Sequence, residues 1–320
     1  MLNVIFMGTP DFARDSLKAI DEAGYKILGV VTNPDRQKGR GMKMIYSPVK
    51  EYALEKGFDV YQPEKVKKNT EFIEKIKSLN PDVICVVAYG KILPKELLDI
   101  PKYGCINVHG SLLPKYRGAA PIQWAVINGE KETGITTMMM DEGMDTGDML
   151  LTEKVQIGED ETTGELWDRL SKIGGSLLVK TLKQIEDGTV KRVKQGDDFT
   201  LAPMLNKEMS KIDWNKTAKE IKNLCRGLNP IMGLYSFVDE KKIKIWKVQN
   251  VTIEEFKERF GEYEESKPGT VILSDAKKGL FISTRDGIIE VLEIQAENAK
   301  RMNVGDFLRG NNIPIGTKLK

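Results

Sequence analysis

The sequence contains a single histidine, His109, and only three cysteines among 320 residues. A zinc site built from Cys and His needs several of these side chains close together, so the scarcity predicts no metal. Cys85, Cys105 and Cys225 are odd in number and widely spaced, which favours reduced thiols in a cytosol. We therefore expect a cytoplasmic protein without disulfide bonds or a bound metal.

Long apolar segments and nucleotide-binding motifs are also absent. No run reaches the ~18 apolar residues of a membrane span. The N-terminus, MLNVIFMGTPDF, lacks the basic start and the cleavage site of a signal peptide. GTPDF offers Gly8 without the three glycines that hold a dinucleotide pyrophosphate, and no phosphate-loop lysine motif occurs. These absences argue against a membrane protein and against binding of NAD or ATP.

The remaining composition is that of a globular protein with two domains. Hydrophobic residues make up 40%, charged residues 30%, and the formal net charge is +2. A chain of this length exceeds the ~250–300 residues of a single core. Residues 207–320 carry 21 basic and 17 acidic side chains, a modest bias that permits a polyanionic partner.

The first part of the chain alternates short apolar runs with amphipathic segments. Between the runs, segments with helical periodicity end at Gly or Asn, as helices often do. This alternation predicts an α/β fold with a doubly wound, Rossmann-like, mostly parallel sheet, whose ligand crevice lies at the carboxyl ends of the strands. The predicted strands are 3–8, 27–33, 82–90, 105–110 and 133–141.

The pattern changes after a predicted helix at 162–187. Residues 188–206 resemble a linker, and short alternating runs between 234 and 295 predict a small C-terminal β-barrel of OB-like type. We therefore expect a first domain at 1–187 and a second at 207–320. The charged segment 254–267 interrupts the runs and is predicted to be a solvated loop or a short helix.

Asn107 and His109 are the first candidate catalytic pair. They lie two residues apart at the end of a predicted strand, so both side chains project to one side of the sheet. An amide donor beside a titratable imidazole could serve catalysis at the crevice. The alternative is a buried structural histidine beside an asparagine that forms a turn.

Three loops could surround this pair. In 111–121, SLLPKYRGAAP, two leucines and a proline could border a flat apolar ligand, although an ordinary connection is the alternative. The loop 140–150 is acidic but lacks the spacing of a calcium loop, and one of its carboxylates could contact His109. The third, 33–44, concentrates basic residues beside glycines. It is either a phosphate-binding arm or a solvated charge run.

Several motifs, in order from residue 4 to about 214, resemble those of the bacterial methionyl-tRNA formyltransferase family, a group of folate-dependent formyltransferases. The core Asn-x-His-Gly-Ser-Leu-Leu-Pro with a downstream Asp-Thr-Gly-Asp is highly specific for folate-dependent formyltransferases. The matching motifs are FMGTPDFA, NPDRQKGRGMK, SPVK, VVAYGKILPK, GCINVHGSLLPKYRGAAPIQWAVINGEKETGITTM, MDTGDM and KIDW.

The resemblance implies an activity and a set of site residues. The activity is transfer of the formyl group from 10-formyltetrahydrofolate to the α-amine of initiator methionyl-tRNA, by an enzyme that we expect to be a monomer. The catalytic residues would be Asn107, His109 and Asp145. The folate-binding residues would be Ser111, Leu112, Leu113, Pro114, Tyr89, Gly90, Ile92, Leu93, Asp141 and Gly143. The tRNA-binding residues would be Arg36, Lys38, Arg40 and Lys43, together with the C-terminal barrel.

The chemistry fits these residue types. An α-amine has a reference pKa of roughly 7.7–8.0, and the neighbouring ester of a charged tRNA lowers this pKa further. The amine is therefore substantially neutral in the cytosol, and donors for the oxyanion are needed more than a strong base. One such donor typically contributes about 10²–10³ in rate. Asn107 supplies a neutral donor. His109 could donate to the oxyanion or, beside Asp145, carry the proton to the leaving nitrogen.

Other functions share these residues. A formyltransferase acting on glycinamide ribonucleotide or an amino sugar would have the same core, but the C-terminal domain and the basic loop argue against it. A hydrolase of 10-formyltetrahydrofolate would use water in place of the amine. A non-catalytic tRNA-binding module would not need the three catalytic residues.

Overall fold

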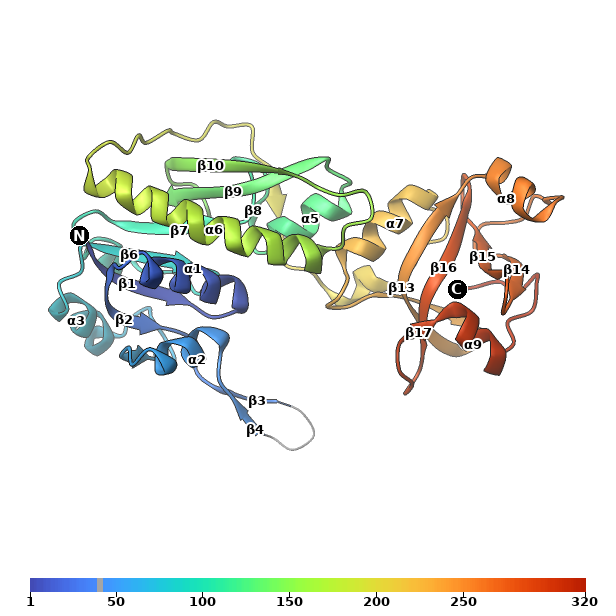
Figure 1. Cartoon of the computed structure of the whole chain (residues 1–320), viewed down its shortest axis with the longest axis horizontal. Coiled ribbons are helices and arrows are strands. Elements are labelled where there is room, and N and C mark those ends of the chain that lie inside the picture. The colour runs from blue at the N-terminus through green and yellow to red at the C-terminus, as the bar shows by residue number, and fades with distance from the viewer. Residues whose placement is uncertain (39–42) are drawn as a thin grey trace. The chain divides into compact units, whose positions relative to one another are not determined.

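The computed structural model describes residues 1–38 and 43–320, with the backbone alone at 37, 38 and 43 (Figure 1). The described residues form two compact units. The first contains 1–122, 132–156 and 166–203, and the second contains 123–131, 157–165 and 204–320. The chain therefore passes between the units several times along its length.

A seven-stranded sheet forms the centre of the first unit among the described residues, in the order β10-β9-β7-β6-β1-β2-β5. Five strands are parallel, and β9 and β10 run antiparallel at one edge. This confirms the predicted doubly wound, mostly parallel sheet. The strands are β1 (Asn3–Gly8), β2 (Lys26–Val31), β5 (Val60–Tyr61), β6 (Val83–Val87), β7 (Cys105–His109), β9 (Glu132–Met139) and β10 (Met149–Gln156).

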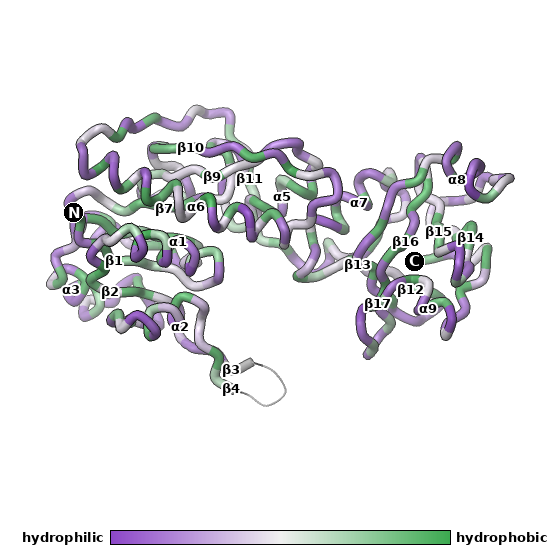
Figure 2. The backbone as a smooth tube through the Cα atoms, in the orientation of Figure 1, coloured by the Kyte–Doolittle hydropathy of each residue, from purple (hydrophilic) through white to green (hydrophobic). Residues whose placement is uncertain are grey.

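Helices cover both faces of this sheet because its central strands are apolar on both sides (Figure 2). Ile5 and Met7 of β1 share a buried cluster with Phe72 of α3 (Thr70–Ser78) and Leu97 of α4 (Lys95–Leu98). On the other face, α1 (Asp11–Glu22) and α6 (Thr163–Glu186) lie side by side (Figure 1). They approach so closely that a Cβ added at Gly175 would lie 2.9 Å from the Ala19 side chain. Helix α2 (Pro48–Glu55) packs against α1 and β2.

Two short strand pairs complete the first unit. β3 (Arg36–Lys38) and β4 (Lys43–Ile45) pair antiparallel. β8 (Arg117–Gly118) pairs in parallel with β11 (Leu201–Ala202), which lies in the segment predicted as a linker. Part of residues 188–206 is therefore bound to the first unit. α5 (Pro121–Ile127) follows β8.

A six-stranded antiparallel sheet forms the second unit among the described residues, in the order β12-β13-β16-β15-β14, with β17 paired to β16. Leu319 donates its N–H to Gly269 O at 2.8 Å, while Lys320 and Phe237 exchange two backbone hydrogen bonds. The last residues thus connect the two ends of the sheet and close a small barrel, as predicted. The strands are β12 (Leu234–Val238), β13 (Lys241–Val251), β14 (Val271–Asp275), β15 (Gly279–Ser283), β16 (Ile288–Ala296) and β17 (Met302–Asn303).

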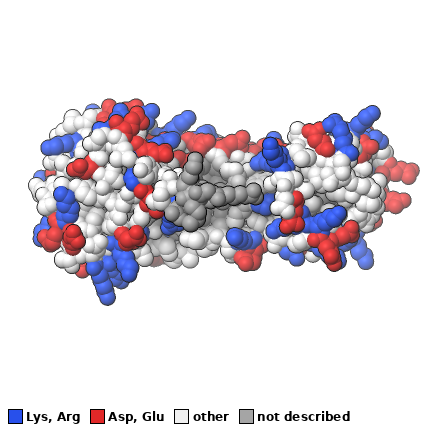
Figure 3. All heavy atoms as spheres, turned by 90° about the horizontal axis from the view of Figure 1, so that it is seen from below, with Lys and Arg blue, Asp and Glu red and all other residues white. Residues whose placement is uncertain are grey.

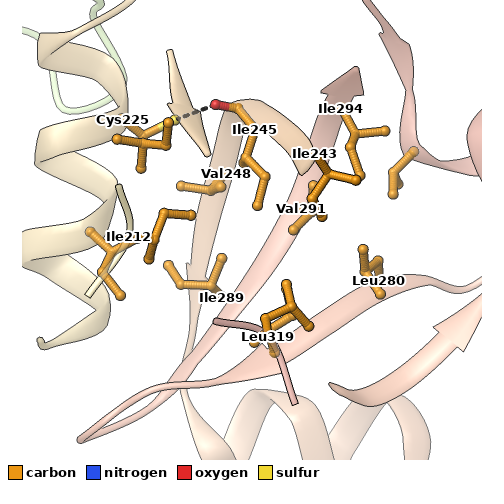
Figure 4. Close-up of a cluster of buried hydrophobic side chains, with 14 of the residues drawn as sticks. Ile212, Cys225, Ile243, Ile245, Val248, Leu280, Ile289, Val291, Ile294 and Leu319 are labelled. Atoms are coloured by element: carbon orange, nitrogen blue, oxygen red, sulfur yellow. Dashed lines mark hydrogen bonds between the residues drawn. The ribbon is translucent and has the colours of Figure 1, made fainter. Parts of the chain in front are cut away.

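Apolar side chains from alternate strand positions fill this barrel (Figure 4). The cluster includes Ile245 of β13 and Val291 of β16, both fully buried. The 3₁₀ turn η1 (Lys207–Ser210) precedes α7 (Ala218–Gly227), which contributes Cys225, and α9 (Val304–Gly310) contributes Phe307. The barrel thus has a core of its own.

An ion pair and several hydrogen bonds attach α7 to residues 157–165. Lys222, whose side chain is 8% exposed, forms an ion pair with Asp160 at 2.5 Å. Arg226 donates to the carbonyl oxygens of Gly158 and Glu161, each at 3.2 Å. These contacts explain why 157–165 belongs to the second unit.

The charged segment 254–267 begins as a helix, α8 (Ile253–Phe260). Thr252 and Glu255 form a capping box at its start. Phe256 is buried against Phe281, with ring centroids 5.5 Å apart. The part of the segment up to Phe260 is therefore an amphipathic helix that covers the barrel with its aromatic face.

Candidate active site

Asn107 and His109 lie on β7 and point to one side of the sheet. β6 and β9 flank this strand, and Asn107 pairs with Val86 of β6 and Met138 of β9. Cys105, on the same side, belongs to the apolar cluster beneath. Side chains alternate between the two faces along β7, so Asn107 and His109 share the face of Cys105. They lie nearer the carboxyl end of the strand, where ligands bind in such folds.

Asp145 comes from the loop between β9 and β10 and reaches both side chains. Its Oδ2 lies 3.5 Å from His109 Nδ1, and its Oδ1 accepts a hydrogen bond from Asn107 Nδ2 at 3.4 Å. The N–H of Gly118 donates to Oδ2 at 2.8 Å. The structure thus brings the three residues that the sequence nominated as catalytic into one cluster.

His109 has an acceptor at each ring nitrogen. Nε2 contacts the carbonyl oxygen of Tyr116 at 2.9 Å, and Nδ1 faces the Asp145 carboxylate. A carbonyl oxygen can only accept a hydrogen bond, so Nε2 donates to Tyr116 O, while the Asp145 carboxylate faces Nδ1. The imidazole is 5% exposed, so these partners, rather than water, determine its orientation.

The loop after β7 is held by hydrogen bonds among its own groups and to β9. Ser111 is fully buried and its hydroxyl donates to Lys115 O at 2.6 Å. Thr136 donates to Ser111 O at 2.7 Å and accepts from the Leu113 N–H at 3.2 Å. Leu113 is buried, whereas Leu112 and Pro114 are partly exposed. Of the four predicted folate contacts here, Leu112 and Pro114 are therefore the more accessible.

Asp141 and Gly143, two predicted folate-binding residues, form hydrogen bonds within the loop 140–148. Asp141 Oδ1 accepts from Gly143 N at 3.0 Å and from the Thr146 hydroxyl at 2.6 Å. A Cβ at Gly147 would lie 1.8 Å from Met139 O, so only glycine fits there. Asp141 and Gly143 are exposed, and Asp141 bonds within the loop while Asp145 reaches His109.

Segment 89–93 is divided between the core and the surface. Tyr89 is 1% exposed, and Leu93 is 4% exposed in the same apolar cluster. Burial raises the pKa of Tyr89 to about 12. Gly90 and Ile92 are exposed, and Ile92 reaches 84% exposure. A ligand at this segment would therefore meet Gly90 and Ile92 rather than the side chain of Tyr89.

The basic segment is described in part. Arg36 is exposed in β3, and the backbones of Lys38 and Lys43 pair across β3 and β4. Arg40 lies outside the described residues. The structure thus brings Lys38 and Lys43 together along the backbone.

The thiols are poor nucleophiles. Cys85, Cys105 and Cys225 are free and buried. Burial raises the pKa of each of them, to about 12 for Cys105 and Cys225, so the reactive thiolate is scarce at neutral pH. Within the described residues, no group of three or more His, Cys, Asp or Glu side chains is arranged to hold a metal ion. The same residues include no helix long and apolar enough to cross a membrane.

Comparison with known proteins assigns the class. Residues 2–182 match the family described as formyl transferase, and residues 204–312 match the formyl transferase C-terminal domain. The chain belongs to the formyl transferase family.

Full-length relatives narrow the assignment. The methionyl-tRNA formyltransferase of Caldanaerobacter subterraneus subsp. tengcongensis is 53% identical over 320 residues, with both chains covered fully. That of Clostridium novyi is 51% identical over 320 residues, again with full coverage of both. The predicted resemblance to methionyl-tRNA formyltransferases is confirmed.

A solved structure shares the fold. The HypX protein of Aquifex aeolicus, in complex with tetrahydrofolic acid, superposes with a TM-score of 0.64 at 15% identity. The match covers 99% of this chain and 50% of that one, so this chain corresponds to about half of HypX. At this identity the likeness concerns the fold alone.

Proposed function

We propose that the chain transfers the formyl group of 10-formyltetrahydrofolate to the α-amine of initiator methionyl-tRNA, giving N-formylmethionyl-tRNA. The observation that supports this most is the meeting of Asn107, His109 and Asp145 at the end of β7, in a chain 53% identical over its full length to a methionyl-tRNA formyltransferase.

Asn107 serves as the donor to the oxyanion. When the amine attacks the formyl carbon, a C–N bond forms and negative charge develops on the formyl oxygen. One N–H of Asn107 points to Asp145 Oδ1 at 3.4 Å, and the other has no partner among the described residues. That second N–H can therefore bind the oxyanion.

His109 and Asp145 act in the transfer of the amine's proton. The attacking nitrogen becomes cationic, and its proton must reach the leaving folate nitrogen as that C–N bond breaks. Asp145 takes this proton as a general base and passes it to the leaving folate nitrogen as the C–N bond breaks, which restores the carboxylate. His109, held by Tyr116 O, stabilises that carboxylate from 3.5 Å. Because both nitrogens of His109 face acceptors in the free protein, the structure favours this supporting role over direct donation to the oxyanion.

The folate site borders this cluster. We assign its surface to Leu112 and Pro114, to Gly90 and Ile92, and to the loop of Asp141 and Gly143, which supply exposed or partly exposed groups on loops at the carboxyl ends of β6, β7 and β9. The other predicted residues support these loops from the core, because their side chains are buried: Ser111, Leu113, Tyr89 and Leu93.

The tRNA contacts are assigned to the basic segment, with Arg36, Lys38, Arg40 and Lys43, and to the barrel domain, 207–320. On the barrel, Lys242 lies 3.8 Å from the ring centroid of Tyr235 and Lys244 lies 5.1 Å from that of Trp246. Basic groups beside aromatic rings suit nucleic acids, because bases stack on rings while cations meet phosphates. Basic and acidic side chains are interspersed on the face drawn in Figure 3, so specific groups rather than a uniform charge would make these contacts.

We further propose a cytoplasmic, monomeric enzyme. The three free cysteines support the reducing compartment. The last residues join the two ends of the barrel sheet, and the barrel has a core of its own, which supports a second unit that does not depend on another copy of the chain.

One assay tests the function against its alternatives. Formyl transfer from 10-formyltetrahydrofolate is measured with initiator methionyl-tRNA, with glycinamide ribonucleotide and with water as acceptors. We expect rapid formylation of the tRNA and slow reaction with the other two. Preference for glycinamide ribonucleotide, or hydrolysis as the main reaction, would contradict the proposal.

A further inference from the structure

We propose that Gln195, outside the catalytic cluster, is a positioning residue that fixes the backbone of Asp145. This inference rests on the proposed function, because it concerns the rate of that same transfer. Gln195 lies in the segment 193–202, which we call the strap. The strap follows α6 and runs beside the loops that carry the cluster.

The side-chain amide of Gln195 makes four hydrogen bonds. Nε2 donates to Asp145 O at 2.9 Å and to Gly147 O at 2.7 Å. Oε1 accepts from Arg117 Nε at 2.9 Å and Nη2 at 2.7 Å. Reversing the amide would set its NH₂ against the guanidinium and its oxygen against two carbonyls, so only one orientation satisfies all four bonds. Arg117 therefore directs the donors of Gln195 at the Asp145 loop.

The backbone conformation of Asp145 needs stabilising contacts from outside its own loop. Asp145 has φ of 55°, the left-handed region that costs a residue with a side chain about 1 kcal/mol or more. Gln195 ties the carbonyls on both sides of Thr146, so rotation of either peptide breaks a hydrogen bond. The Asp145 carboxylate makes long contacts of 3.4 and 3.5 Å to Asn107 and His109, which a small rotation would lose.

The strap also holds the second loop of the site. The Tyr116 N–H donates to the Thr200 hydroxyl at 2.9 Å, and the Arg117 N–H donates to Thr200 O at 2.8 Å. This loop supplies Tyr116 O to His109 and the Gly118 N–H to Asp145. The strap therefore holds both loops that meet at the His109–Asp145 contact. Thr200 holds the loop that carries Tyr116 and Gly118, and Gln195 holds the loop that carries Asp145.

The guanidinium of Arg117 is fixed in turn. Arg117 is 8% exposed, and its guanidinium lies 4.5 Å from the ring centroid of Phe199. An arginine stacked on a ring and bidentate to an amide has little rotational freedom. Phe199, Arg117 and Gln195 thus form a chain of contacts that ends at Asp145.

Two substitutions separate this role from general stability. Gln195→Ala removes all four hydrogen bonds. Gln195→Glu keeps an acceptor for Arg117 and loses both donors to the Asp145 loop, so the strap stays attached while Asp145 is released. Asp198→Asn, at an exposed position of the strap, is the matched control. We expect both Gln195 variants to lower kcat about 10- to 100-fold, the size of effect that a misplaced catalytic group produces. The KM values for folate and tRNA should change less than about twofold, since uniform binding is untouched.

A double-mutant cycle shows whether Gln195 acts through Asp145. In an Asp145→Asn background, Gln195→Glu should have no further effect on single-turnover transfer, because the group it positions has already lost its function. A purely structural role would lower the rate by the same factor in both backgrounds. Melting temperatures identify any variant that is unfolded at the assay temperature, and Gln195→Glu carries the test if Gln195→Ala is unfolded.

The outcomes separate the two proposals. If the parent protein transfers no formyl group to methionyl-tRNA, the proposed function is wrong. If the parent is active and the folded Gln195→Glu variant matches it, or if the two substitutions multiply in the cycle, the positioning role is wrong.

Discussion

At the scale of single residues, the site depends on which atoms can donate and which can only accept. Asp145 gathers donors from Asn107 and from the backbone of Gly118, while His109 lies between two acceptors. The amide of Asn107 cannot titrate, so its donor is present at every pH of interest. We therefore expect Asn107 and His109 to contribute to the reaction in different ways.

Replacing either residue by alanine should slow the reaction while the protein stays folded. We expect Asn107→Ala and His109→Ala each to lower the single-turnover rate by at least ~10², since an oxyanion donor or an equivalent electrostatic group contributes that much. Circular dichroism serves as the folding control. A near-parental rate for either folded variant would remove that residue from the mechanism.

At the scale of the element, strands with a strong apolar pattern were predictable and short or edge elements were not. β1, β6 and β7 match predicted runs because both of their faces are buried. β10 was missed because, at the sheet edge, charged residues such as Glu153 and Lys154 interrupt its pattern. Strands of two residues, such as β8 and β11, contain no period to detect.

Some residues of the candidate site could also be predicted from the sequence, and others could not. Motif order nominated Asn107, His109 and Asp145, and the fold brings them together. Gln195 could not be nominated, because its partners lie 48 to 78 residues earlier in the chain and only folding brings them near. Tyr89 matched a family motif, yet the sequence could not reveal that its side chain is directed into the core.

The start of α7 gives a pH-dependent prediction. Hydrogen bonds from the backbone and side chain of Thr217 lower the pKa of Glu220 from its usual value. A carboxylate with a lowered pKa stabilises the fold above its unfolded pKa of ~4.3 and loses that contribution as the pH falls through the folded value. Glu220→Gln should therefore be less stable than the parent at pH 7, and the difference should shrink near pH 3.

Urea unfolding at both pH values tests this prediction. Glu258→Gln, an exposed position of α8, is the matched control and should show no comparable change. Equal losses for Glu220→Gln at pH 7 and pH 3 would mean that the charge of the capping carboxylate contributes nothing.

The basic segment gives another prediction at this scale. Arg40, outside the described residues, lies between β3 and β4 in sequence. If it binds tRNA phosphates, Arg40→Ala should lower kcat/KM for charged tRNA and flatten its salt dependence, because fewer counterions are released. Arg40→Lys should restore activity if charge suffices, and should fail to do so if the planar fork is needed.

The measurement is kcat/KM across a salt series, with folate binding as an internal check that should not change. Arg14→Ala, an exposed arginine on α1, is the control for loss of one positive charge. Parental behaviour of both Arg40 variants at every salt concentration would show that the segment is only solvated charge.

At the scale of the whole molecule, the native state should respond to folate and not to nucleotide cofactors. Tetrahydrofolate analogues should raise the melting temperature, because a ligand at 100 times its Kd adds about 2.7 kcal/mol to the native state. NAD and ATP should leave it unchanged, since their phosphate-binding motifs are absent. A thermal-shift panel measures all three. A response to a nucleotide without a response to folates would overturn the folate assignment.

The interleaving of the two units restricts how the protein can be dissected. A fragment that begins at residue 204 would contain the whole barrel, but it would lack 123–131 and 157–165, which pack with it. In such a fragment Lys222 would lose Asp160, and Arg226 would lose the carbonyls of Gly158 and Glu161. The fragment would also lose Ile127, which packs against the barrel core, so apolar surface of that core would be exposed to water. A single cut in the coding sequence therefore cannot release an intact second unit, and expression of the barrel on its own would need these two segments restored.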